Sequence, residues 1–347
     1  MDRVYRYRVK GSSSLRLLAR MAWLVNFVWN YVNDAQRHAV RWGRPWLTGY
    51  DINALTDGAS KELGLNAQTI QAIGQQYASS RATHRKRWLR YRGARALGWV
   101  PFKASGIKQA GNGFKFMGHV FRVWLSRPVP GRIKCGSFAQ DSLGHWYINL
   151  CVDVPVATTC GPGEVGIDLG LKTTATMSNG EKYDGVRAYR ANEPKLAVAQ
   201  RARKKQRVKT LHAQAKNRRL DGLHKLTTRL VRENKRVVVG DVSSTKLAKT
   251  KMAKSVYDAG WGMLRGMLRY KTLAGGATYL EVDEYLSSQM CSACGSLPES
   301  RPRGIAQLGI RERACTQCKT GHDRDINAAR NILALGSERP AEGIPVL

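Results

Sequence analysis

The stretch VGIDLGLKTTATMSNGEKYDG, residues 165–185, decides how the second half of the chain folds. Its short apolar runs, separated by turn residues, predict three short antiparallel strands. Asp168 lies within the first run between apolar neighbours, and a buried carboxylate without a partner there would cost several kcal/mol. The position therefore calls for a cation, and a divalent metal shared with a second carboxylate would supply one.

A second carboxylate is offered by GHDRDINAARNIL, residues 321–333. Asp323 and Asp325 precede apolar residues at helical spacing, which predicts a helix with a carboxylate at its N-terminus, aimed back toward the sheet. Taken alone, the stretch fits a plain capping aspartate equally well. Together with Asp168 it fits Mg²⁺ chemistry, because phosphodiester cleavage by paired metals requires two or three carboxylates around the ions.

Helices and strands alternate between these two stretches. A very basic helical region, residues 195–235, precedes the buried strand RVVVGDV, residues 236–242. A helix with Trp261, Leu264 and Leu268 on one face follows and is stopped by a glycine pair, and ATYLEVDE, residues 277–284, predicts another strand. This order predicts a mixed sheet with helices packed on it.

The first half of the chain has a different pattern. Residues 2–9 alternate apolar and basic side chains, which predicts a half-buried strand, and residues 12–42 and about 67–93 have apolar residues at helical spacing. Short β-branched and aromatic runs over residues 99–154 predict a small β-barrel or sheet, completed by the N-terminal strand across the helical insertion.

The composition points to a polyanionic partner. The 347 residues include 58 Lys and Arg against 25 Asp and Glu, a formal net charge of +33, and nucleic acid is the commonest partner for such a field. A membrane surface is the rival, but no apolar run is long enough to span a bilayer and no signal-peptide core begins the chain. We therefore expect a cytoplasmic, nucleoid-associated protein without a membrane partner.

Two dense basic runs are the candidate nucleic-acid contacts, although charged helix faces are often merely solvated. Their residues are Arg85, Lys86, Arg87, Arg90 and Arg92, and then Arg201, Arg203, Lys204, Lys205 and Arg207. Trp88 and Tyr91 in the first run, and Trp29 in the first helical stretch, could stack on bases, whereas aromatic residues at helical spacing are more often part of a core.

Four of the seven cysteines have metal-ligand spacing: Cys291, Cys294, Cys315 and Cys318 form two CxxC pairs separated by twenty residues. Four thiolates at this spacing can close a tetrahedral shell around one structural Zn²⁺ and leave no position open for substrate. An iron–sulfur cluster is the alternative.

The stretches 166–180, 255–271, 287–295 and 322–333 together closely resemble the TnpB/OrfB family, the transposon-encoded ancestor of the type V CRISPR effectors. The first 155 residues resemble the family only in layout. The resemblance implies an α+β multidomain protein with a RuvC-type RNase H-like α/β domain, interrupted by a zinc-binding module and preceded by a wedge β-barrel that holds a helical recognition domain. It also implies a transposon-end RNA that guides cleavage of DNA next to a short flanking motif.

The implied domain boundaries follow the chain. We expect the wedge barrel at 1–10 and 97–158, the helical recognition domain at 11–96, the RuvC-like domain at 159–286 with its final motif at 321–335, the zinc-binding target-nucleic-acid module at 287–320, and a tail at 336–347.

One departure from the family pattern matters. In most relatives the strand matching VVVGDV carries the second catalytic acid where this chain has Gly240. Asp241 should point to the opposite face, because side chains alternate along a strand. Glu284, after the next strand, could reach the same metals, with Glu281 and Asp283 as weaker candidates, although a solvated strand-end carboxylate is the simpler interpretation.

The expected protein is thus an RNA-guided, Mg²⁺-dependent DNA endonuclease with Asp168, Glu284 and Asp325 as ligands of two metal ions. Asn327 would orient a ligand or contact the scissile strand. We expect a monomeric protein in a ribonucleoprotein with guide RNA and target DNA. The alternative is a nuclease-dead, RNA-guided repressor, and a zinc transcription factor lacks the expected helix-turn-helix or finger pattern.

Overall fold

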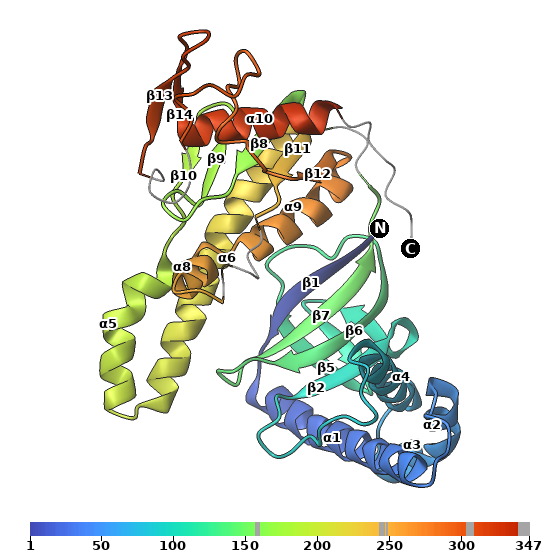
Figure 1. Cartoon of the computed structure of the whole chain (residues 1–347). Helices are drawn as coiled ribbons and strands as arrows, with labels where there is room; N and C mark the ends of the chain where they lie inside the picture. Colours follow the sequence, from blue (N-terminus) through green and yellow to red (C-terminus); the bar gives the residue numbers. More distant parts are fainter. Residues whose placement is uncertain (157–159, 243–246, 248, 303–308, 339–347) are drawn as a thin grey trace. The chain divides into compact units, whose positions relative to one another are not determined.

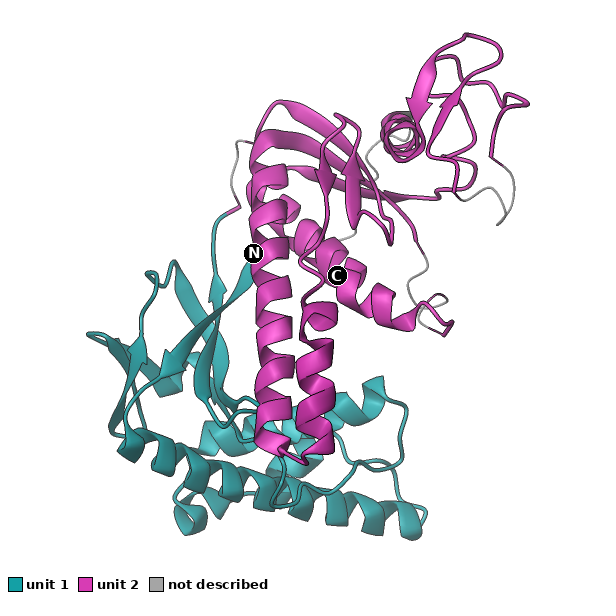
Figure 2. Ribbon diagram, turned by 90° about the vertical axis from the view of Figure 1, so that its left-hand side faces the viewer, with its two compact units in different colours: residues 1–155 teal, residues 156–347 magenta. Residues whose placement is uncertain are grey.

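The computed structural model describes the chain except residues 157–159, 243–246, 248, 303–308 and 339–347. It contains two compact units, residues 1–155 and 156–347, coloured separately in Figure 2. The expected boundary at 158/159 lies outside the described residues, as does most of the expected tail. Among the helices described, none is both long and apolar enough to cross a bilayer.

The first unit is built on a seven-stranded sheet. All its pairs are antiparallel, in the order β2-β6-β7-β1-β5-β4-β3. The strands are β1 (Asp2–Val9), β2 (Trp99–Lys103), β3 (Ile107–Ala110), β4 (Gly113–Phe116), β5 (His119–Trp124), β6 (Arg132–Gln140) and β7 (Trp146–Asp153). The N-terminal strand completes this sheet from a central position, as predicted, and buried phenylalanines fill the core.

Four helices lie between β1 and β2 in the chain, as Figure 1 shows in blue. They are α1 (Ser12–Arg41), α2 (Gly49–Leu55), α3 (Ala59–Leu63) and α4 (Ala67–Thr83). The predicted helix over 67–93 is too long, because α4 ends at Thr83. The segment after it is fixed by α1 instead, since Asn33 accepts a hydrogen bond from the Leu89 N–H at 3.0 Å and Asn30 bonds the backbone of Arg92 in both directions. Side chains of α1 thus replace the helical hydrogen bonds of this segment.

The second unit is built on a five-stranded mixed sheet in the order β10-β9-β8-β11-β12. Its strands are β8 (Gly163–Asp168), β9 (Ala175–Met177), β10 (Lys182–Tyr183), β11 (Asn234–Gly240) and β12 (Thr278–Val282). The pairs β8–β9 and β9–β10 are antiparallel, as predicted for the opening stretch, and β11 is parallel to both β8 and β12. Three parallel strands therefore end at the same edge of the sheet.

Helices cover both faces of this sheet (Figure 1). Val237 and Val239 pack with α6 (Lys205–Glu233) and α9 (Trp261–Gly275), whereas Val238 packs with α10 (Arg324–Glu338) on the other face. The predicted stripe of Trp261, Leu264 and Leu268 is fully buried against the first face. Helix α5 (Ala188–Arg201) pairs with α6 as a hairpin, and α8 (Ala253–Ala259) follows β11. The alternation along β11 thus assigns each residue to one helical layer.

Helix α10 lies unusually close to β8. A Cβ placed on Gly166 would lie 2.1 Å from the carbonyl oxygen of Ala329 and 2.7 Å from the backbone nitrogen of Leu333. Both atoms belong to the helix backbone, which cannot move aside as a flexible side chain can. Glycine at 166 therefore sets the distance between α10 and the sheet.

We predict that Gly166→Ala destabilises the protein by about 3 kcal/mol, because the added methyl group must push α10 off the sheet. Gly262→Ala is the control, since a Cβ at Gly262 in α9 meets nothing within 4 Å. That change should stabilise the protein by about 0.5–1 kcal/mol through helix propensity. Denaturant unfolding measures both, and unchanged stability of the Gly166 variant would contradict the close packing.

Candidate functional site

Residues 168, 240 and 284 lie on one face of the sheet, at the ends of its parallel strands. In the parallel register Gly166 is opposite Val238, and Gly240 is opposite Val282. Each of these residues is on the α10 side. Side chains alternate along a strand, so Asp168, two residues after Gly166, and Glu284, two residues after Val282, lie on the same face. Asp168 is the last residue of β8, where sequence analysis placed it within the strand.

Glu284 fills the space that a side chain at position 240 would use. A Cβ placed on Gly240 would lie 3.1 Å from Oε2 and 3.4 Å from Cβ of Glu284. The same point is 3.0 Å from Cδ1 of Ile332 on α10. The missing side chain at Gly240 and the inward turn of Glu284 are therefore complementary features of one site.

The neighbouring acids face the other way. Asp241 forms an ion pair of 2.9 Å with Arg265 on α9, the helix on the opposite face. Glu281 accepts hydrogen bonds from Arg269 of α9 at 2.8 Å and from Tyr279 at 2.7 Å. The prediction that Asp241 points away from the face of residue 240 is confirmed, and Glu281 is committed to α9 in the same way.

The third predicted acid, Asp325, lies in the first turn of α10. Asp323 caps this helix, since one of its oxygens accepts the backbone N–H groups of Asp325 and Ile326 at 3.0 Å each. The capping interpretation therefore holds for Asp323, which also pairs with Lys182 at 2.7 Å, and leaves Asp325 available to the site. The helix N-terminus adds a positive partial charge beside Asp325.

Arg311 is a functional neighbour that sequence reasoning missed. Its Nη1 donates to both carboxylate oxygens of Asp325 at 2.9 Å. The available signal was a pair of arginines at alternate positions, Arg311 and Arg313, just ahead of the second CxxC pair. The guanidinium of Arg311, just ahead of the second CxxC pair, therefore lies at the site in contact with Asp325.

Burial raises the pKa of Asp168 to about 7, and the nearby charges of Asp325 and Glu284 raise it further in the same direction. Burial and the charges of Asp241 and Asp283 likewise raise the pKa of Glu284. Both shifts mean that the ionised forms are disfavoured without a cation close by. The three acids therefore share one electrostatic environment.

These donors suit a hard divalent cation such as Mg²⁺, which prefers carboxylate oxygens. The three carboxylates do not converge tightly. Among the described residues, the four cysteines are the one group of three or more His, Cys, Asp or Glu side chains close enough to share an ion. A metal held by the acids would therefore draw their oxygens together and offset the repulsion that raises the pKa of Asp168.

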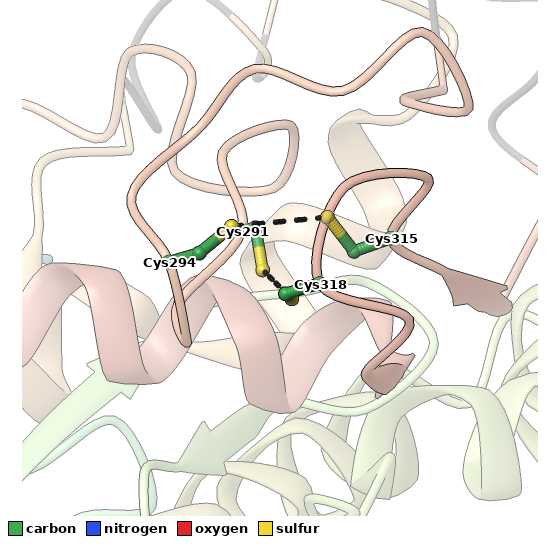
Figure 3. A group of neighbouring side chains, drawn as sticks. All are labelled: Cys291, Cys294, Cys315 and Cys318. Atoms are coloured by element: carbon green, nitrogen blue, oxygen red, sulfur yellow. Dashed lines mark hydrogen bonds between the residues drawn. The ribbon is translucent and has the colours of Figure 1, made fainter.

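The four predicted cysteines come together, as Figure 3 shows. Their sulfur atoms all lie within 4.8 Å of one another. The two CxxC turns have the same hydrogen bonds: the Cys291 N–H donates to Ser296 O and the Cys315 N–H to Thr320 O, each at 2.9 Å. Backbone N–H groups, first that of Cys318, lower the pKa of Cys315 to about 6, whereas burial raises the pKa of Cys291 to about 11. A metal ion bound by the four sulfur atoms would hold them all as thiolates.

The burial of Asn327 weighs against its predicted contact with the scissile strand, while its predicted role in orienting a ligand stays a prediction. It is 1% exposed, and its side-chain nitrogen donates to Met290 O at 2.7 Å while its oxygen accepts the Ser292 N–H at 2.9 Å. Asn331 donates to Ser287 O at 2.7 Å. A side chain so buried has almost no surface for nucleic acid, so Asn327 instead ties the first CxxC turn to α10.

The predicted basic residues divide into two groups. Arg201, Arg203, Lys204, Lys205 and Arg207 are all exposed at the turn of the α5–α6 hairpin. Arg85, Lys86, Arg87 and Arg90 are also exposed, but Arg92 stacks 3.8 Å from the ring centroid of Trp29. Burial lowers the pKa of Arg92, which is half-buried. Arg92 is therefore less suited than its neighbours to contact a phosphate.

The aromatic candidates divide similarly. Trp29 is buried and packs edge-on against Tyr77, so for this residue the interpretation as part of a core is confirmed. Trp88 and Tyr91 are exposed, and the guanidinium of Arg37 lies 5.2 Å from each ring centroid. Both rings thus already stack on Arg37 of the same chain. Base stacking by Trp88 and Tyr91 stays a prediction.

Comparison with known proteins agrees with this geometry. Residues 149–251 match the OrfB_IS605 family model, described as "Probable transposase", and residues 261–332 match the model described as "Cas12f1-like, TNB domain". The second match spans α9, β12, the four cysteines and most of α10. A solved Cas12f1–sgRNA–target DNA complex matches with a TM-score of 0.59 at 12% identity, covering 93% of this chain and 83% of that chain. At this identity the likeness concerns the fold.

Two curated relatives have more similar sequences. A Streptomyces pristinaespiralis protein named "Putative RNA-guided DNA endonuclease" is 39% identical over 235 residues, 63% of this chain and 57% of that protein. InsQ of Escherichia coli K12, named in the same terms, is 31% identical over 241 residues, 61% of this chain and 58% of that protein. This chain thus spans somewhat over half the length of either relative. With residues 149–251 and 261–332 matching its two models, the chain belongs to the TnpB/OrfB family.

Proposed function

We propose that the chain is an RNA-guided, metal-dependent DNA endonuclease of transposon origin. The observation that carries the proposal is the alignment of Asp168 and Glu284 on the face of the sheet beside Asp325, with Glu284 lying over Gly240. The names of the relatives and the nucleic acids in the matched Cas12f1 complex support the choice of substrate and guide.

Asp168, Glu284 and Asp325 would hold two Mg²⁺ ions. When bound, such a metal pair supplies an activated water and stabilises the leaving 3′ oxygen. Asp325 can keep its contact with Arg311 while it binds a metal, since each carboxylate oxygen has a second lone pair. Arg311 would therefore orient Asp325 without excluding the ion.

A transposon-end RNA would guide the cleavage, and base pairing rather than protein contacts would read the target sequence. The exposed basic turn between α5 and α6 suits the phosphate backbone of the guide or of its duplex with the target. The sheet and helices of residues 1–155 would read the short flanking motif. The protein would act as a monomer within this ribonucleoprotein at the nucleoid.

The four cysteines would hold one Zn²⁺. Four thiolates complete the tetrahedral shell, so this ion would stabilise the fold of the segment and would not act on substrate. The ties from Asn327 and Asn331 to the first CxxC turn would then transmit its rigidity to α10.

A nuclease-dead RNA-guided repressor is the second candidate, because Gly240 replaces the usual acid. Glu284 weighs against it: a solvated carboxylate would have no reason to lie 3.1 Å from the point where the side chain of residue 240 would begin.

We predict that Asp168→Asn, Glu284→Gln and Asp325→Asn each reduce guided cleavage at least about 1000-fold with target binding intact, because the carboxylates position the metals as a unit. Asp241→Asn is the matched control and should cut nearly as well as the parent, since Asp241 faces α9. Guided cleavage of a labelled duplex in Mg²⁺ and a filter-binding assay measure the two properties.

Moving the acid tests the site more sharply. The double variant Gly240→Glu with Glu284→Ala should recover part of the activity that Glu284→Ala loses, because Glu284 occupies the space beside residue 240. A fully active Glu284→Gln protein would show that the glutamate is misassigned. A parent that binds target but never cuts would favour the repressor.

The raised pKa of Asp168 predicts a pH dependence. Because the folded-state pKa is about 7 and the ordinary value is 3.8, the folded protein holds a proton that the unfolded chain loses. In EDTA, the free energy of unfolding should therefore fall as pH rises from about 4 to 7, by about 1.4 kcal/mol per unit at most. Asp168→Asn should reduce this slope and leave only the share of Glu284, whose pKa is also raised, while Asp241→Asn should keep the share of Asp168. An unchanged slope in Asp168→Asn would refute the assignment.

We also predict that the protein purifies with one dominant RNA species, since a net charge of +33 favours a polyanion and a guide must be specific. Replacing Arg203, Lys204, Lys205 and Arg207 by Gln should weaken RNA binding and flatten its salt dependence. Sequencing of the copurified RNA decides the point. A random mixture released by moderate salt would leave only non-specific charge binding.

A further inference from the structure

One histidine touches the cysteine group without belonging to it. Nε2 of His322 lies 3.0 Å from Sγ of Cys291, and the two residues are 6% and 0% exposed. His322 lies in the middle of β14 (Gly321–Asp323), which pairs with β13 (Glu312–Ala314), and the two strands flank the second CxxC pair in the chain. A thiolate at Cys291 would make His322 the donor, since the sulfur then has only lone pairs to offer.

Arg313 is a buried cation in the same ladder. It lies directly opposite His322 in the β13–β14 register and is 9% exposed. Its Nη2 donates to the carbonyl oxygens of Gln289 at 2.7 Å and Met290 at 3.2 Å. Its Nε and Nη1 are buried and find no hydrogen-bond partner among the residues that the structure describes. A buried guanidinium without an anion is costly, so its position calls for a negative charge close by.

The cysteine group provides that charge when it holds zinc. Four thiolates outweigh one Zn²⁺, so the filled site carries negative charge, and its two buried members, Cys291 and Cys315, need donors and cations around them. His322 and Arg313 project from the same face of one ladder, because they are directly opposite residues of a strand pair. The buried arginine and the charge of the filled site would therefore compensate each other.

The β13–β14 ladder is also connected to Asp325 through the chain. His322 is followed by Asp323, whose carboxylate caps α10 and accepts the N–H of Asp325 at 3.0 Å. The Cys291 contact of His322 therefore fixes the strand from which the first turn of α10 begins. A shift of this strand would move Asp325 with it.

We infer that His322 and Arg313 form an outer shell of the zinc site: His322 donates its Nε2–H to the Cys291 thiolate, Arg313 balances the charge, and the pair fixes the strand that positions Asp325. The inference rests on the proposed zinc site. It makes His322 a positioning residue and not a zinc ligand.

The test is zinc affinity, measured by competition with a chromophoric chelator on the full chain. His322→Leu should raise the zinc dissociation constant about 10- to 100-fold. His322→Gln should recover most of the affinity, because its amide keeps an N–H donor. His212→Leu is the control, since His212 is exposed on α6 and should leave the affinity unchanged. Arg313→Met should weaken zinc binding about tenfold or more, and Arg313→Lys less.

Cobalt substitution separates a donor from a ligand. The parent and His322→Leu proteins should both show the near-ultraviolet sulfur-to-cobalt charge-transfer absorption and the visible d–d bands of four thiolates. Loss of a nitrogen ligand on His322→Leu would overturn the outer-shell role, and so would equal zinc affinity in the parent and in that variant. If the parent protein binds no zinc, both the proposed zinc site and this inference are wrong.

Mn²⁺ binding to the carboxylates, followed by electron paramagnetic resonance, tests the positioning step. His322→Leu should weaken Mn²⁺ binding several-fold in zinc-loaded protein, and His322→Gln should restore it. Unchanged Mn²⁺ binding in a folded His322→Leu protein would show that the strand does not position Asp325.

Discussion

The contact between α10 and the parallel strands is the constraint on which the rest of the second unit depends. The helix backbone lies against Gly166, so no side chain larger than hydrogen fits there. Because strands alternate their faces, this contact assigns residues 168 and 240 to the α10 side and Asp241 to the α9 side. The edge where β8, β11 and β12 end thus receives its acids from different parts of the chain.

Electrostatic repulsion then shapes the site. Burial, and after it the charges of Asp325 and Glu284, raise the pKa of Asp168, while Arg311 and the N-terminus of α10 place positive charge beside Asp325. Glu284, after the neighbouring strand, offers a carboxylate next to the point where a side chain on residue 240 would begin. The proposed metal site can take its acid from either strand, because a metal responds to the placement of oxygen atoms and not to their order in the chain.

The cysteine-rich segment is held to the same helix through polar contacts. Asn327 and Asn331 bond the backbone before Cys291, and Arg311 reaches from the other side of the segment to Asp325. These bonds are largely buried, where a hydrogen bond left unmade costs more than a formed one contributes. The segment and α10 are therefore expected to move as one body. Ordering of the cysteine group would then also fix the position of Asp325 on α10.

Local pattern determined much of this protein. The strands of residues 165–185, the buried stripe of α9, the central β1 and the four-cysteine group follow from alternation, helical period and CxxC spacing, which depend on near neighbours in the chain. The length of α4 did not, because Asn30 and Asn33 of a distant helix hold the segment after Thr83. Arg92 and Trp29 looked available for nucleic acid, yet tertiary packing stacks them on each other. Only the tertiary structure placed Glu284 over Gly240, Arg311 on Asp325 and His322 on Cys291, because each pair joins strands or turns that meet only after the sheet and α10 have packed.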